Sequence, residues 1–206
     1  MELTLDKLRE QIPYHGVLLG FFTLATSAAL VAANLVTGPA IEKAAREDLQ
    51  ATLRQVLPEG LTDNELLADT VRVDDRGLAH TVYRGRKAGT FTAAVFDYSA
   101  QGYAGEIKVL IGVDAAGTVM GVRVLKHLET PGLGDKIEVA KADWIHSFAK
   151  KSLDNLPLAR WAVKKDGGDF DQFAGATITP RAVVKAVKEG LQFYAAHRAE
   201  ISGDAK

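Results

Sequence analysis

A threonine near the C-terminal end of the chain stands where a phosphate could be bound or attached. Thr177 lies in the segment 166–180, whose fifteen residues include three acidic residues and three glycines and lead directly into a helical pattern. A phosphate on its hydroxyl would face the unpaired N–H groups and the positive end of the helix dipole. The same residues also fit an ordinary helix cap, in which Thr179 accepts from those N–H groups and Asp171 solvates the turn.

A second segment combines a Pro-Gly pair with polar side chains. It spans residues 127–136 and reads HLETPGLGDK. The pattern is compatible with a simple type II turn, after which Gly134 begins the next element. It is also compatible with a binding loop, because glycine lets the backbone approach a flat ligand closely. The polar side chains around this backbone are those of His127, Glu129, Thr130, Asp135 and Lys136.

Composition narrows the chemistry that these segments can perform. The 206 residues include no cysteine, which excludes disulfides, thiol nucleophiles and cysteine-ligated iron–sulfur clusters. The five histidines show neither HxxxH nor HxH spacing, and no GxGxxG or GxxxxGK[ST] loop is present. A formal net charge of −1 argues against a non-specific nucleic-acid partner, which would need a basic surface. Any redox chemistry is therefore expected to use an organic cofactor.

The residues that must position these segments predict an α+β domain with an antiparallel sheet and flanking helices. The alternating runs that predict strands lie around residues 71–73, 80–83, 91–96, 106–113 and 119–125. The glycine-containing connection 114–118 joins the last two runs and predicts a hairpin.

Two helices are expected in the second half of the chain. Residues 143–151 predict a short one. The closing helix is expected to have Thr179 as its cap and Pro180 in its first turn. Its apolar stripe consists of Val183, Val184, Val187, Leu191 and Tyr194.

The chain is also expected to contain a membrane anchor. Residues 16–36 carry no charged side chain, and a helix of about 21 residues spans a hydrocarbon core of roughly 30 Å. A signal peptide and a buried core helix are the alternatives. The length of the run favours an anchor, and so does the segment 1–15, which lacks the basic start of a signal peptide because its three acidic residues outnumber its two Lys and Arg residues. Residues 37–60 predict an amphipathic stalk or an entry helix to the domain, and residues 61–206 predict the folded domain. The flanking charges are nearly balanced, so they do not indicate an orientation.

Two motifs resemble those of a known family. Residues 171–177, DQFAGAT, resemble the D-x-x-[ST]-G-A-[ST] signature at which a flavin transferase esterifies FMN. Residues 127–134, HLETPGLG, look like the H-x-E-T-P-G-L-G segment of the same FMN-binding domains. The similarity extends through 161–168 and 177–184, and the whole looks like the G subunit of the Rnf (Rsx) electron-transport complexes. Ala174 departs from the usual Ser or Thr, which bears on how the transferase recognises the site.

This resemblance implies a membrane-bound flavoprotein that works as an electron-carrier subunit rather than as an independent enzyme. FMN would be held covalently through a phosphoester, and residues 61–206 would form the FMN-binding domain. The cofactor-binding residues that the resemblance and the two segments suggest are Thr177, Gly175, Ala176, Asp171, Glu129, Thr130, Gly132, Leu133, Gly134, His127 and Lys164. The family places this domain on the periplasmic side of the bacterial inner membrane. Its partners would be the other membrane and redox subunits, and a flavin transferase for maturation.

Other functions fit parts of the pattern. The C subunit of the sodium-pumping NADH:quinone reductase shares both motifs but is typically longer, and a stand-alone FMN-domain protein would also carry them. A membrane-anchored assembly module without redox chemistry would contain the two glycine-rich segments merely as turns. Covalently bound flavin would distinguish the flavoproteins from the assembly module.

Overall fold

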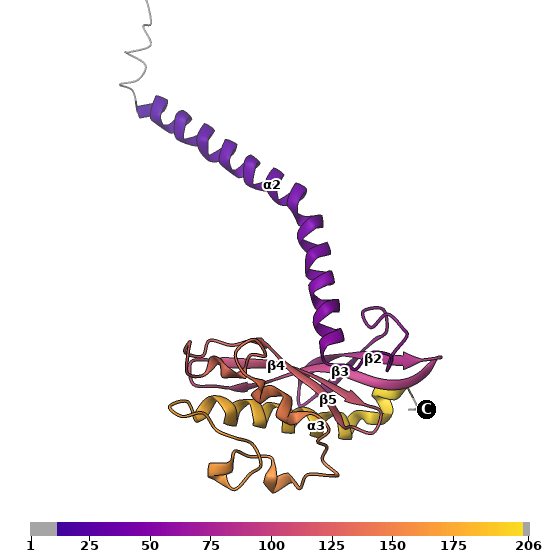
Figure 1. Ribbon diagram of the computed structural model, residues 1–206. Helices are drawn as coiled ribbons and strands as arrows, with labels where there is room; N and C mark the ends of the chain where they lie inside the picture. Colours follow the sequence, from indigo (N-terminus) through magenta and orange to yellow (C-terminus); the bar gives the residue numbers. More distant parts are fainter. Residues whose placement is uncertain (1–11, 204–206) are drawn as a thin grey trace, which may run out of the picture. The chain divides into compact units, whose positions relative to one another are not determined.

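The computed structural model describes residues 12–203, which fall into two compact units divided between Asp48 and Leu49. Figure 1 shows the elements in chain order. The helices and strands are α2 (Ile12–Gln55), β1 (Thr70–Asp75), β2 (Leu78–Lys87), β3 (Thr90–Gln101), β4 (Glu106–Asp114), β5 (Val119–Lys126) and α3 (Ile178–Ser202). Between β5 and α3 the chain is irregular and contains the short 3-10 helices η1 (Asp135–Ile137), η2 (Asp143–Phe148), η3 (Leu158–Arg160) and η4 (Lys164–Asp166).

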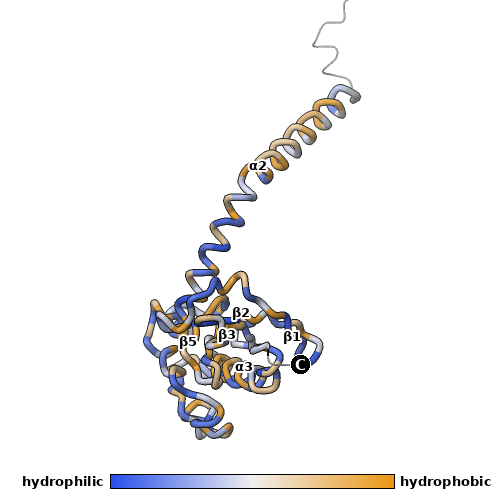
Figure 2. Tube along the Cα trace, turned by 90° about the vertical axis from the view of Figure 1, so that its right-hand side faces the viewer, coloured by the Kyte–Doolittle hydropathy of each residue, from blue (hydrophilic) through white to orange (hydrophobic). Residues whose placement is uncertain are grey.

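Helix α2 contains the apolar run of residues 16–36. It is long and apolar enough to cross a membrane, and none of its apolar stretch is buried inside the described protein, unlike a core helix. The hydroxyls of Thr23, Thr26 and Thr37 each donate at 2.8 Å to the carbonyl four residues earlier, so these polar groups are satisfied within the helix. In Figure 2 the hydropathy along α2 changes from hydrophobic to hydrophilic beyond this run.

The predicted anchor 16–36 and most of the predicted stalk 37–60 are parts of one continuous helix. Pro39 lies inside α2, which continues to Gln55. Of the predicted N-terminal segment 1–15, residues 12–15 belong to α2, and the remaining residues lie outside the described part of the chain.

The five strands form one antiparallel sheet in the order β1-β2-β3-β4-β5, so every strand pairs with its neighbour in sequence. This confirms the predicted α+β class. The predicted β4–β5 hairpin is also present. Asp114 Oδ1 accepts there from the N–H groups of Ala116 at 2.9 Å and Thr118 at 2.8 Å.

Apolar side chains on the two faces of the sheet form two separate clusters. On one face α3 packs through residues that include Val187 and Leu191. On the other face, Leu53 and Val56 at the end of α2 and just beyond it are fully buried. Gly112 lets the chain lie directly on the sheet there, because a Cβ at this position would come within 2.5 Å of the Val56 carbonyl oxygen.

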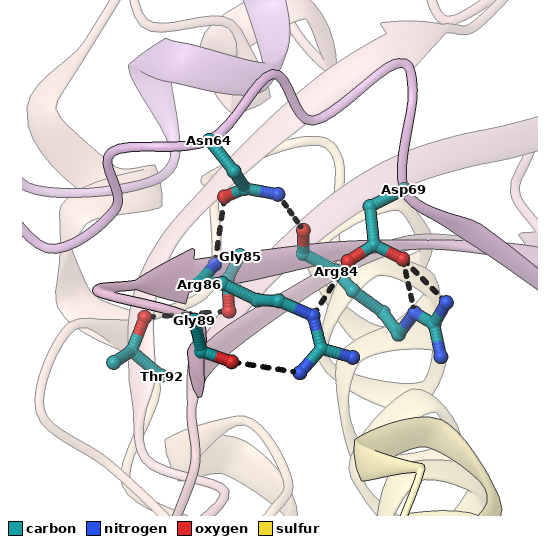
Figure 3. Close-up of polar contacts among 7 residues, drawn as sticks. All are labelled: Asn64, Asp69, Arg84, Gly85, Arg86, Gly89 and Thr92. Carbon is teal, nitrogen blue, oxygen red and sulfur yellow. Dashed lines mark hydrogen bonds and ion pairs between the residues drawn. The ribbon is translucent and has the colours of Figure 1, made fainter.

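Polar contacts fasten the segment between α2 and β1 to β2, as Figure 3 shows. Asn64 accepts from the N–H of Arg86 at 2.7 Å and donates to the carbonyl of Arg84 at 2.9 Å. Asp69 accepts from the Nε atoms of Arg84 at 2.6 Å and Arg86 at 2.7 Å. Burial raises the pKa of Asp69, but the hydrogen bonds and charges of the two arginines outweigh it and hold the pKa below its usual value.

The predicted cap of the closing helix is wrong. Helix α3 begins directly after Thr177, and Thr179 is already inside it. The Thr179 hydroxyl is buried and donates to Oε2 of Glu129, so it is not free to cap the helix. Pro180 remains in the first turn, as expected from its preference for that position.

The predicted helix 143–151 is shorter and of another type. It forms the 3-10 helix η2, which ends at Phe148. Ala149 is extended, with a ψ of 140°, and Lys150 has a φ of 65°, so the chain leaves the helical conformation there.

Candidate functional site

Both of the glycine-rich segments singled out from the sequence line one cavity of about 470 Å³ in the folded domain. Its walls come from three places: the connection between β3 and β4, the 127–136 segment, and the residues around the start of α3. The lining residues are Tyr103, Glu129, Thr130, Leu133, Gly134, Gly175, Ala176, Thr177, Ile178 and Thr179.

Seven of the eleven suggested site residues therefore lie together. The four that do not line the cavity are His127, Gly132, Lys164 and Asp171. The three lining residues absent from the suggested set are Tyr103, Ile178 and Thr179.

Glu129 joins the three walls through its carboxylate. Its side chain is 5% exposed. Oε1 accepts from the backbone N–H groups of Tyr103 at 2.9 Å and Ala104 at 3.1 Å, and Oε2 accepts from the hydroxyl of Thr179. Both oxygens of this buried group are thus paired, as a buried carboxylate requires.

Thr177 holds its hydroxyl at the cavity beside the start of α3. It is the N-cap residue, with φ −70° and ψ −29°, and its side chain makes no capping hydrogen bond. The first turn of α3 therefore offers N–H groups that the Thr177 side chain does not occupy, although Pro180 has none to offer. Gly175, with a φ of 81°, turns the chain two residues before Thr177. A phosphate at the Thr177 hydroxyl would lie at the positive end of the helix dipole.

His127 lies outside the cavity and links two parts of the loop, at Glu129 and Glu138. Its Nδ1 accepts from the N–H of Glu129 at 3.2 Å, and its Nε2 lies 3.0 Å from Oε1 of Glu138. This arrangement requires the tautomer with its proton on Nε2, which is then donated to Glu138. Gly132, with a φ of 78°, lies at the exposed bend between these contacts. Both residues therefore shape the loop from outside the cavity.

Lys164 and Asp171 form an ion pair outside the cavity, with Nζ and Oδ1 2.6 Å apart. Both side chains are more than half exposed, so this pair contributes little to stability. The Asp171 carbonyl also accepts from Nε1 of Trp144 at 2.8 Å. These contacts fix the beginning of the segment that leads to Thr177.

Tyr103 carries no signal of its own in the sequence. It lies in the turn 101–105, QGYAG, and reaches the cavity because its N–H bonds to a residue 26 positions later. The two glycines of this turn were the available sign in the sequence of a tight bend. In the structure, the N–H of Gly102 donates to the carbonyl of Gly105 at 2.7 Å. Ile178 could have been suggested only from its position beside Thr177.

The cavity suits a flat ring that carries a phosphate. Tyr103, Leu133 and Ile178 expose 71%, 44% and 46% of their surfaces, which offers apolar contact to a ring. Two glycines in the wall leave the backbone approachable. The hydroxyl of Thr177 stands where the phosphate would be held.

Two family models and several relatives match this chain. Residues 102–192, which contain every lining residue of the cavity, match the FMN-binding domain family, and residues 1–56 match the RnfG N-terminal region. The chain is 51% identical over 188 residues to the G subunit of the ion-translocating oxidoreductase complex of Stutzerimonas stutzeri, covering 91% of this chain and 82% of that protein. It is 43% identical over 192 residues to the corresponding protein of Vibrio vulnificus, covering 91% of each.

A solved structure shares the fold. The crystal structure of Shewanella oneidensis NqrC matches with a TM-score of 0.50 at 21% identity, covering 70% of this chain and 73% of that chain. At this identity the match supports the architecture of the domain alone.

Proposed function

This chain belongs to the RnfG family, the G subunits of ion-translocating oxidoreductase complexes, and we propose that it carries electrons through FMN esterified to Thr177. Membership of the family decides between the Rnf protein and its quinone-reductase relative. The covalent bond to Thr177 and the assignment of residues around the flavin are proposed in addition to family membership.

The observation that carries the proposal is that Thr177 lines the cavity at the start of α3 while its side chain makes no capping hydrogen bond. In the ester, Oγ1 of Thr177 is bonded to the flavin phosphate in place of its proton. The N–H groups of the first turn of α3 would donate to the phosphate oxygens. Of the other threonines lining the cavity, Thr179 is 1% exposed and donates to Glu129, while Thr130 belongs to the 127–136 segment and not to the start of α3.

The residues of the cavity hold the flavin rather than act on a substrate. FMN supplies the chemistry when bound, because it accepts and passes electrons one at a time. Leu133, Tyr103 and Ile178 line the cavity and would pack against the ring, and Gly134 would let the loop backbone approach it. Electron transfer demands position and potential but no general base, so independent turnover of a substrate is not expected.

We further propose that α2 anchors the chain in the bacterial inner membrane, with the domain on the periplasmic side beside the other membrane and redox subunits. A large domain that follows a single span is translocated largely regardless of flanking charge. Protease added to spheroplasts should cleave the domain. Protection of the domain in intact spheroplasts, with cleavage after lysis, would place it in the cytoplasm instead.

Flavin fluorescence after denaturing electrophoresis tests the attachment. The full-length chain, expressed with a flavin transferase, should give a fluorescent band that survives denaturation. Thr177→Ala should abolish the band, whereas Thr81→Ala, a threonine on β2 away from the cavity, should keep it. A wild-type band that stays dark while a known flavinylated protein fluoresces would favour the assembly module without redox chemistry.

A further inference from the structure

The carboxylate of Glu129 is the point at which the three walls of the cavity meet. It receives the N–H groups of Tyr103 and Ala104 from the β3–β4 connection and the hydroxyl of Thr179 from α3. Thr179 lies 50 residues beyond Glu129 in the sequence and two residues beyond Thr177. The hydrogen bond between them therefore ties the loop to the helix that begins at the attachment site.

Two glycines show how closely the chain packs around this carboxylate. A Cβ at Gly102 would lie 2.5 Å from Oε1 of Glu129. A Cβ at Gly134 would lie 2.8 Å from Cβ of Glu129 and 2.9 Å from Oγ1 of Thr179. Neither glycine can take a side chain without moving the pair, so the position of the carboxylate is fixed from both sides.

Glu129 is also the only charged side chain among the described residues that line the cavity. A buried carboxylate in such a wall is a fixed negative charge, and its field acts over short distances with little screening by water. The donors that it accepts from partly offset that charge. The hydroxyl of Thr179 is the one side-chain donor among the three contacts, so it can be removed by substitution without changing the backbone.

We infer that Glu129 and Thr179 form a positioning pair that holds the cavity walls together and sets the reduction potential of the flavin. The inference rests on the proposed function. Reduction brings electrons, and therefore negative charge, to the ring, and a fixed carboxylate in the wall opposes that gain. Thr179 moderates the opposition by donating to Oε2 of Glu129.

Substitutions at Glu129 and Thr179 should shift the midpoint potential of the flavin in opposite directions. Glu129→Gln removes the charge but can keep the contacts, since the amide oxygen accepts from the backbone and the amide nitrogen donates to Thr179. The midpoint potential should therefore rise. Thr179→Val keeps the shape of the side chain and removes the donor, so the charge of Glu129 is less offset and the potential should fall. Thr179→Ser retains the hydroxyl and should restore the wild-type potential.

The experiment is a potentiometric titration of the full-length, flavinylated protein in detergent, with a chemical reductant supplying the electrons and absorbance reporting the flavin. Thr81→Val is the matched control and should leave the potential unchanged. Unchanged potentials in both Glu129→Gln and Thr179→Val, with covalent flavin present, would overturn the inference and leave the proposed function intact. Absence of covalent flavin from the wild type would instead overturn the proposed function.

The positioning role also has a readout that does not need flavin. In a Thr177→Ala background, hydrogen exchange at the amides of Tyr103 and Ala104 reports how firmly Glu129 is held. Adding Thr179→Val should speed exchange at these two amides, and adding Thr81→Val should not. Equal protection in both double variants would show that the hydroxyl of Thr179 does not hold the carboxylate in place.

Discussion

Gly168 lies where the segment before Thr177 folds back on itself. A Cβ at this position would lie 1.8 Å from the carbonyl oxygen of Ala162, far closer than two such atoms can approach. The N–H of Gly168 donates to the carbonyl of Val163 at 3.0 Å, so moving the backbone aside would cost that bond. The turn that leads to Thr177 therefore requires a residue without a side chain at position 168.

Gly168→Ala should destabilise the domain by about 3 kcal/mol, because the added carbon forces the backbone to rearrange. The neighbouring Gly167 is the control. It has a φ of 83° but nothing within 4 Å of an added Cβ, so Gly167→Ala should cost only about 1–2 kcal/mol through backbone strain. Urea unfolding of both variants measures the difference. Equal losses of stability in the two variants would show that the chain accommodates the Cβ added at position 168 without an extra energetic cost.

At the residue scale, the site is predictable where its residues are adjacent in sequence. Thr177, Gly175 and Glu129 each lie in a contiguous motif, and the structure places all three in one cavity. The role of Thr179 was not predictable, because a threonine before proline looks like a cap and its actual partner is 50 residues away. Tyr103 was missed for the same reason, since it reaches the cavity only through the fold of the sheet.

At the scale of elements, the connection between α2 and β1 covers one face of the sheet. Apolar residues of this connection, Leu57 and Leu66, are buried over that face. Its polar anchors are Asn64 and Asp69, which bind β2 (Figure 3). The connection is therefore part of the domain core rather than a flexible linker, and its attachment depends on charge.

Asp69→Asn should weaken the domain by roughly 1–3 kcal/mol at neutral pH, the range for hydrogen bonds to charged groups. The folded pKa of Asp69 lies below its usual value of 3.8, so its contribution is present above that value and is lost as the pH falls through the lower folded pKa. The difference in the free energy of unfolding between wild type and Asp69→Asn should therefore disappear between about pH 5 and pH 2. Urea unfolding across this range measures it.

Asp74→Asn is the control for this prediction, because Asp74 is an exposed carboxylate on β1. The free energy of unfolding of Asp74→Asn should depend on pH in the same way as that of the wild type. A gap between wild type and Asp69→Asn that stays constant down to pH 2 would contradict the assigned role of the Asp69 charge.

The strands were predictable because their apolar residues alternate, and all five lie where the pattern indicates. The register was not, because the shifts between Gly85 and Arg86 and between Gly112 and Val113 arise from packing across strands. The short helices after β5 were even less predictable from the sequence. Segments of three to six residues in 3-10 conformation carry no periodic apolar stripe long enough to recognise.

At the scale of the whole molecule, the folded domain includes the last residues of α2. The sequence places the domain boundary at residues 60 and 61, after the turn signal Pro58-Glu59-Gly60, whereas the second compact unit begins at Leu49. Turn residues are visible locally, but the burial of Leu53 against the sheet is a tertiary contact.

Two fragments distinguish these boundaries. Residues 49–206 retain the buried end of α2 and should be soluble and unfold cooperatively. Residues 61–206 lack Leu53, Val56 and Leu57, and each buried apolar side chain is worth about 1.5–3 kcal/mol. The shorter fragment should therefore be less stable by more than about 3 kcal/mol, measured by urea unfolding. Equal stability would show that the domain does not need the end of the helix.

The most direct test of the central claim is mass spectrometry of the tryptic peptide 166–181 from the full-length protein matured with its transferase. This peptide contains both Thr177 and Thr179. The account predicts a peptide heavier by FMN less one water, with fragment ions that assign the added mass to Thr177, because the Thr179 hydroxyl is buried and engaged with Glu129. An unmodified peptide, or added mass on Thr179, would contradict it.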